Sequence, residues 1–307
     1  MSSIKSLATR KKNGGKVGAL KYISDYPSLN LKQYGNTYKI YSYNKMKIQG
    51  ISKKITVNGL DQFIDIPKIE VANAKILNKP DGYYIAITTY QNIDDLTKKE
   101  YIGEEIGIDF GIKSNITLSN GETFNCSIGE TKRLKRLQRK MTRQQKGSNN
   151  RYKTRRLIRK EYQKIDNKKC DFANKLVHKL LSYKNVYMQD ENLKGWHSGW
   201  FGKQIQHSTM GTIKHKLLMS NQVHVLDRYA PTTKYCPICG NIKDDISLSD
   251  RVYHCDKCGY ESDRDIHSAN NMIIMFKQIP TEHREFKPVE NTTVFNEAGR
   301  LHPLGCN

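Results

Sequence analysis

Long apolar runs are missing from this sequence of 307 residues. No stretch approaches the roughly 18 apolar residues that a membrane-spanning helix needs, and mean hydropathy is −0.72. The basic first 16 residues also lack the apolar segment of a secretory signal. These absences exclude an integral membrane protein, and they predict a soluble, cytoplasmic protein that does not use a membrane as a partner.

Acidic residues are scarce relative to basic ones. The chain has 52 Lys and Arg against 30 Asp and Glu, which gives a net charge of +22. Such an excess repels itself unless a polyanion is near. The charge is concentrated in one segment, so nucleic acid is the predicted partner. A basic surface without a partner and an anionic membrane are the alternatives.

The segment that holds most of this charge has helical periodicity. Leu134, Leu137 and Met141 recur at helical spacing, and the sequence GSNN at 147–150 then breaks the pattern. A second apolar series follows at the same spacing. We therefore predict two antiparallel helices that form a basic hairpin over residues 131–180.

This hairpin has almost no acids. Residues 131–169 contain 17 Lys and Arg but only Glu161 and Asp166 as acids. A solvated helix normally pairs opposite charges four residues apart, and that pairing is nearly impossible here. The pattern favours a surface that follows phosphates over an ordinary solvated helix face. The predicted nucleic-acid contacts on it are Lys132, Arg133, Arg136, Arg139, Arg143, Arg151, Arg155, Arg156 and Arg159.

Cysteines are few, and four of the seven fall in two CxxC pairs. The motifs CPICG at 236–240 and CDKCG at 255–259 have the spacing of a zinc ribbon. Four thiolates satisfy the tetrahedral preference of Zn²⁺ and leave no position for water, so the ion is structural. Two disulfides or four free thiols are the alternatives. The predicted ligands are Cys236, Cys239, Cys255 and Cys258.

Three acids lie at or near the ends of predicted elements. Asp109 interrupts the apolar strand IGIDFG, Glu191 ends the strand VYMQDE, and Asp265 opens a helix. An acid inside an apolar strand is costly unless it is paired or binds a metal. Converging carboxylates would select Mg²⁺ or Mn²⁺ for phosphodiester hydrolysis. Asp190 and Asp263 compete with their neighbours for these roles.

Four motifs in order resemble one family. IGIDFGIK, QDENLKGW, CPICG with CDKCG, and DRDIHSANN look like the RuvC-type nuclease core of the TnpB proteins, which are transposon-encoded, RNA-guided DNA endonucleases related to type V CRISPR effectors. The likeness covers roughly residues 35–276. Ordered co-occurrence is more specific than any single motif.

The resemblance implies an α/β RNase H-like (RuvC) nuclease domain that follows a small all-β unit. A helical recognition domain would be represented only by its end, because the sequence is short for the family. The implied parts are that remnant at 1–34, a wedge-type oligonucleotide-binding β-barrel at 35–102, the nuclease domain at 103–234 and 260–280, a zinc ribbon at 235–259, and a mobile tail at 281–307.

The resemblance also implies activity and partners. Asp109, Glu191 and Asp265 match the catalytic acids, with Asp263 in reserve, and would hold Mg²⁺ or Mn²⁺. The partners would be a guide RNA from the transposon end and double-stranded target DNA, bound in the prokaryotic nucleoid. Trp196 and Arg264 would contact nucleic acid. A truncated or repurposed binding protein without cleavage activity, or an inactive gene product, is the alternative.

Overall fold

The computed structural model describes residues 2–18, 26–64, 68–92, 100–247 and 249–278. The tail expected at 281–307 lies outside these ranges. Within them, none of the helices combines the length and the apolar character that a membrane crossing demands.

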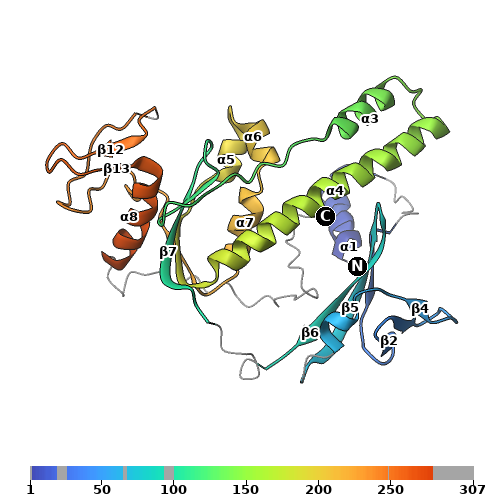
Figure 1. Cartoon of the computed structure of the whole chain (residues 1–307). Coiled ribbons are helices and arrows are strands. Elements are labelled where there is room, and N and C mark those ends of the chain that lie inside the picture. The colour runs from blue at the N-terminus through green and yellow to red at the C-terminus, as the bar shows by residue number, and fades with distance from the viewer. Residues whose placement is uncertain (1, 19–25, 65–67, 93–99, 248, 279–307) are drawn as a thin grey trace.

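A five-stranded mixed sheet is the centre of the larger part of the chain (Figure 1). Its order is β11-β10-β7-β8-β9, with β7, β8 and β9 antiparallel and with β10 and β11 added in parallel to β7. The strands are β7 (Gly103–Phe110), β8 (Ile116–Leu118), β9 (Thr123–Phe124), β10 (Tyr183–Gln189) and β11 (Val223–Leu226). The strands predicted around IGIDFG and VYMQDE are confirmed.

Helices cover both faces of this sheet (Figure 1). Side chains of α4 (Asn149–Leu180) and α7 (Met210–Leu217) form the main core with alternate residues of β7, Ile106 and Ile108 among them. The helix α8 (Arg264–Gln278) packs on the opposite face, where Asp109 hydrogen bonds to it. Because side chains alternate along a strand, β7 gives apolar residues to one face and an acid to the other.

The close packing of α8 on β7 depends on Gly107. A Cβ atom at this position would lie 1.9 Å from the carbonyl oxygen of Ala269 and 3.4 Å from the Ile273 side chain. No real Cβ contact is so short, so only glycine lets the helix backbone approach the strand here. This glycine lies two residues before Asp109 on the same face.

The basic hairpin is confirmed. It consists of α3 (Lys132–Thr142) and the first half of α4, and it projects from the sheet in Figure 1. The side chains of Thr131 and Ser148 accept hydrogen bonds from backbone N–H groups of the first turns and cap the two helices. Leu134 and Ile158 pack between the helices in a small core of their own.

The N-terminal part contains two three-stranded antiparallel sheets rather than one closed barrel in the residues described. The first is formed by β1 (Ser28–Leu31), β5 (Glu70–Lys79) and β6 (Gly82–Tyr90). The second is formed by β2 (Tyr38–Ser42), β3 (Lys45–Ile48) and β4 (Ile55–Thr56). Both contribute to one core, and the Tyr38 hydroxyl donates to the Ala72 carbonyl (3.1 Å) between them.

Two short helices complete this part, α1 (Ser2–Lys12) and α2 (Asp61–Ile64). The helix α1 lies in the stretch 1–34, for which the resemblance implies the end of a helical domain. The strand β1 lies in the same stretch. Its pairing with β5, which joins Leu31 to Ala74, is a long-range contact that the local pattern does not contain.

Two short helices follow Glu191. They are α5 (Leu193–Ser198) and α6 (Gly202–His207). Glycine lowers helix propensity in this segment, but the Asn192 side chain caps α5 by accepting from the Gly195 N–H (3.0 Å), and Trp196 packs against the main core. Local capping and tertiary packing override the propensity.

Candidate active site and metal centre

The four predicted zinc ligands converge in a ribbon formed by β12 (Val252–His254), β13 (Glu261–Asp263) and the two CxxC turns. The Sγ atoms of Cys236 and Cys258 are 3.5 Å apart, and those of Cys239 and Cys255 are 3.6 Å apart. Four thiolates at about 2.3 Å from one ion would be about 3.8 Å from each other in a tetrahedron. The cluster therefore fits Zn²⁺ closely.

Both CxxC turns have the glycine that their geometry needs. Gly240 and Gly259 adopt φ values of +69° and +74°, and their N–H groups donate to the carbonyls of Cys236 and Cys255. A side chain would strain this left-handed conformation. Backbone conformation and backbone hydrogen bonds thus shape both turns.

The three predicted catalytic acids come from three elements that meet at one edge of the sheet. Asp109 is the second-last residue of β7, and Glu191 follows β10 by two residues. Because these strands are parallel neighbours, their carboxyl ends lie side by side. Asp265 is in the first turn of α8, the helix that packs on β7.

The other two acids affect the pKa of Asp109. Burial raises the pKa of this carboxyl group to about 7, and the charges of Asp265 and Glu191 add to the effect. A hydrogen bond from the Ser268 hydroxyl (3.1 Å) and the charge of Arg264 oppose the increase. Three neighbouring carboxylates that repel one another form a site in which a divalent cation is favoured.

The three acids are spaced more widely than the four cysteines. Only the four cysteines, among the residues described, place three or more ligand atoms of His, Cys, Asp or Glu within 4.8 Å of one another.

The structure separates Glu191 from Asp190. Asp190 accepts from the Lys214 ammonium (2.7 Å) and from the Arg228 guanidinium (3.0 Å), so its pKa is lowered first by the Lys214 hydrogen bond. Burial instead raises the pKa of Glu191. In the described part of the chain, no side chain donates to the Glu191 carboxylate. Asp190 is therefore held in ion pairs, while Glu191 is available to a ligand.

Asp263 has a different role from Asp265. One Asp263 carboxylate oxygen accepts from the N–H groups of Asp265 (3.0 Å) and Ile266 (3.1 Å), which makes Asp263 the cap of α8. The carboxylate of Asp265, rather than that of Asp263, acts on Asp109. Asp265 is thus the acid whose charge reaches Asp109, whereas the reserve candidate Asp263 caps the helix.

A chain of buried hydrogen bonds supports the site, and the sequence analysis did not find it. Ser268 donates to Asp109 and also lies 3.2 Å from the hydroxyl of Thr232, which in turn donates to the Gln189 side chain (3.0 Å). These residues join β7, α8 and the end of β10. Small polar residues in an apolar strand and helix were the only available signal.

Lys214 of α7 is a second residue that sequence reasoning missed. Its ammonium group donates to the Glu191 carbonyl (2.7 Å) as well as to Asp190, and its side chain is only 12% exposed. A cation so deeply placed stabilises the turn that follows β10. The turn in this way presents Glu191 to the site.

The two other predicted nucleic-acid contacts, Arg264 and Trp196, both interact with other parts of the protein. The Arg264 guanidinium lies 3.6 Å from Asp265 and donates to the Ser247 carbonyl (3.2 Å). Trp196 is partly buried against the main core and so contributes to packing. Trp200, in contrast, is fully exposed.

Most of the predicted basic contacts are exposed on α3 and α4, and Arg151 is the exception. Its guanidinium group donates to the carbonyls of Met141 (2.5 Å) and Gln144 (3.0 Å) and so satisfies the C-terminus of α3. Arg133 is exposed but lies 3.3 Å from the buried carboxylate of Glu161. Arg151 thus holds the hairpin together.

The mixed sheet with acids at one edge, helices on both faces and a four-cysteine ribbon before the last helix define a RuvC-like nuclease fold with a zinc-ribbon-type domain. A family model described as a probable transposase, OrfB_IS605, matches residues 85–188. A second, described as the Cas12f1-like TNB domain, matches residues 210–272. Together the two matches support the TnpB family for this chain.

Curated relatives agree with this assignment. The chain is 30% identical over 190 residues to a "Putative RNA-guided DNA endonuclease" of Streptomyces pristinaespiralis, covering 59% of this chain and 47% of the relative. It is 25% identical over 234 residues to the "Putative RNA-guided DNA endonuclease InsQ" of Escherichia coli K12, covering 66% and 56%. A "TnpB-like protein L79" of Acanthamoeba polyphaga mimivirus is 26% identical, covering 54% and 36%. The chain spans about half the length of the first two.

Proposed function

We propose that this chain is the nuclease of an RNA-guided system and that it hydrolyses DNA phosphodiester bonds with divalent metal ions. The observation that carries the proposal is the convergence of Asp109, Glu191 and Asp265 at one sheet edge, where burial, with the charges of Asp265 and Glu191 added, raises the pKa of Asp109 to about 7. The names of the relatives support DNA as the substrate.

The chemistry follows from the donor set. Carboxylate oxygens suit Mg²⁺ or Mn²⁺, and two such ions would activate a water molecule and stabilise the leaving oxygen of the phosphodiester. The chain's own residues orient the ligands. Ser268 holds one Asp109 oxygen, Lys214 fixes the backbone at Glu191, and Asp263 holds the first turn of α8.

The proposed partners are a guide RNA from the transposon end and double-stranded target DNA. Exposed basic side chains on α3 and α4 would follow the backbone phosphates by charge, while base pairing with the guide supplies the sequence specificity. Bound in this way, the protein would be associated with the nucleoid.

The N-terminal sheets are the proposed oligonucleotide-binding unit, corresponding to the wedge-type domain of the family. Their surface exposes Tyr41, Tyr43 and Tyr83. The ammonium group of Lys54 lies 4.2 Å from the centre of the Tyr41 ring. Aromatic faces beside cations suit stacking with bases and contact with phosphates.

The test is a cleavage assay on the RNA-bound protein. The chain is purified, its co-purifying RNA is sequenced, and the complex is incubated with matching DNA and Mg²⁺. We expect the wild type to cut and Asp109→Ala to leave DNA intact while still binding RNA. If RNA is bound but both proteins leave the DNA intact, the nuclease proposal is wrong, and the chain is a binding protein without cleavage activity.

A further inference from the structure

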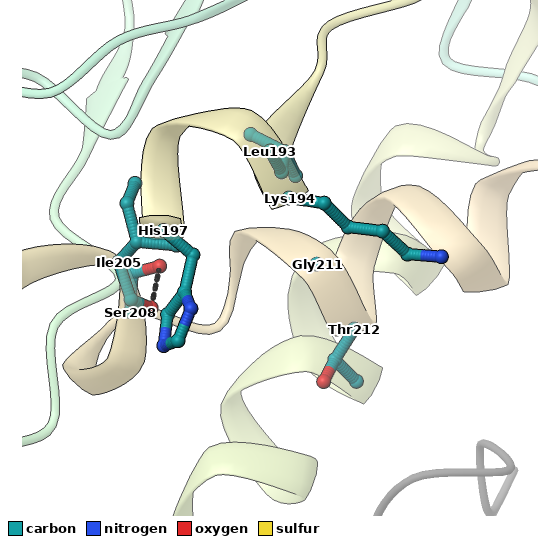
Figure 2. Close-up of a pocket in the computed structure, with 7 residues that line it drawn as sticks. All are labelled: Leu193, Lys194, His197, Ile205, Ser208, Gly211 and Thr212. Atoms are coloured by element: carbon teal, nitrogen blue, oxygen red, sulfur yellow. Dashed lines mark hydrogen bonds between the residues drawn. The ribbon is translucent and has the colours of Figure 1, made fainter. Parts of the chain in front are cut away.

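A cavity of about 310 Å³ lies between the short helices α5 and α6 and the start of α7. Figure 2 shows Lys194 and His197 projecting on either side of Gly211, with Thr212 next to it on the same helix. The lining residues are Leu193, Lys194, His197, Ile205, Ser208, Gly211 and Thr212.

The walls of this cavity are attached to the turn that carries Glu191. The N–H of Leu193, at the start of α5, donates to the Glu191 carbonyl (3.0 Å). Lys214, one turn along α7 from Gly211, donates to the same carbonyl (2.7 Å). A ligand in the cavity would therefore contact α5 and α7, the two helices that hydrogen bond to the Glu191 backbone.

The lining has the chemistry of a base-binding pocket. Leu193 and Ile205 offer apolar surface, Lys194 offers a cation, and the His197 ring and the Thr212 hydroxyl hydrogen bond to no protein group among the residues described. A volume near the lower end of the roughly 300–1,000 Å³ typical of ligand pockets suits one nucleotide and excludes a duplex.

We propose that this pocket receives one unpaired base of the DNA strand that the acidic site cuts, with Lys194 placed to contact an adjacent phosphate. Enzymes that act on DNA commonly bind a single unstacked base between apolar side chains and hydrogen-bonding groups. The inference rests on the proposed function for its choice of strand. Its test, however, measures binding and needs no cleavage.

Gly211 allows the pocket to be closed without disturbing the fold. A Cβ atom added there would meet nothing within 4 Å, and the residue is in a helix, where leucine is a better helix former than glycine. Gly211→Leu therefore fills the cavity and should leave thermal stability unchanged or higher. Gly18→Leu is the matched control, because its added Cβ also meets nothing, in the N-terminal part of the chain.

The experiment uses the full chain with Asp109→Asn, so that no substrate is consumed. Fluorescence anisotropy measures its affinity for single-stranded DNA oligonucleotides in which one base at a time is removed to leave an abasic site. We expect one position at which base loss weakens binding about tenfold, in line with the usual worth of a stacked base. Gly211→Leu should weaken the binding of intact DNA to the same degree. In this variant, base loss at that position should have no further effect on affinity.

Four results would overturn the inference. The first three are the absence of any sensitive position, an unchanged affinity of the Gly211→Leu protein, and a sensitivity that persists in that protein. The fourth is an equal loss of affinity in the Gly18→Leu protein. The cleavage assay is a separate test. If the wild type does not cut DNA but Gly211→Leu still weakens DNA binding as described, the nuclease proposal is wrong and the pocket proposal is supported.

Discussion

Asp109 is the residue whose negative charge suits metal binding but lowers the stability of the folded protein. In the folded protein, burial and the Asp265 charge raise its pKa to about 7, whereas an unfolded Asp titrates near 3.8. Between these values the folded state binds a proton that the unfolded state has lost. Stability therefore falls as pH rises from about 4 to 7, and above pH 7 the whole penalty is present.

The first prediction is that Asp109→Asn stabilises the magnesium-free protein while abolishing cleavage. At pH 8 the gain should reach at most about 4 kcal/mol, from about 1.4 kcal/mol per pKa unit, and it should be small near pH 4. Thermal unfolding of the zinc-loaded protein at several pH values measures it. A gain of equal size at pH 4 and pH 8 would show that ionisation of Asp109 is not the source of the gain.

The sequence predicts which acids meet, but only the structure decides between neighbours. Asp109 stands out because a charge in an apolar strand needs a reason. Asp190 and Glu191 are equivalent in the sequence, and only the positions of Lys214 and Arg228 show that Asp190 is paired. Such ion pairs come from residues more than 20 positions away, which a local pattern cannot reveal.

Gly107 decides how closely α8 packs on β7. Its replacement by alanine would place a Cβ atom 1.9 Å from the backbone oxygen of Ala269, and that oxygen can move only with its helix. We predict that Gly107→Ala destabilises the protein by about 1–3 kcal/mol or more, as overpacking does, and displaces Asp265. Denaturant unfolding measures it. Gly211→Ala is the control, and equal stability of the two variants would contradict the packing argument.

The α3–α4 hairpin allows binding and folding roles to be separated. Changing Arg136, Arg139 or Arg155 to Gln should weaken nucleic-acid binding and lower the slope of log affinity against log salt by about 0.7–0.9 per lost phosphate contact. Arg151→Gln should instead lower thermal stability, because its guanidinium group caps α3. Filter binding at several salt concentrations measures the first effect. Unchanged slopes would mean that these arginines do not contact phosphates.

Elements with strong periodicity were predictable, and those fixed by distant contacts were not. The hairpin, β7, β10 and α8 follow from apolar spacing and from capping residues such as Ser148. The strand β1 depends on pairing with β5, more than 40 residues away, and α5 depends on packing of Trp196 against the core. Neither contact can be predicted from the residues of its own segment.

At the scale of the molecule, the zinc ribbon and the acidic site are connected through α8. The strand β13 ends at Asp263, the cap of α8, and six residues lie between Cys258 and Asp265. The Tyr253 ring of the ribbon stacks on His267 of α8, with ring centres 3.9 Å apart. Burial lowers the pKa of His267 to about 4, so its ring is neutral in this contact at neutral pH.

We therefore predict that removing zinc loosens α8 as well as the ribbon. Hydrogen exchange should increase over residues 264–278, and cleavage should stay lost when Mg²⁺ alone is restored, because folding of a structural zinc site is coupled to its metal. Exchange in α3 should not change and provides the internal control. Protected α8 amides after zinc removal would show that the helix is held by the sheet alone.

The central claim is that Asp109, Glu191 and Asp265 bind catalytic divalent ions, and Mn²⁺ binding tests it without guide or target. Isothermal titration of the zinc-loaded protein, compared with Asp109→Asn, Asp265→Asn and Asp263→Asn, measures the number of ions bound. Asn is as good a cap as Asp, so Asp263→Asn should bind Mn²⁺ like the wild type, while the other two should lose it. Equal Mn²⁺ binding by the wild type, Asp109→Asn and Asp265→Asn would contradict the account.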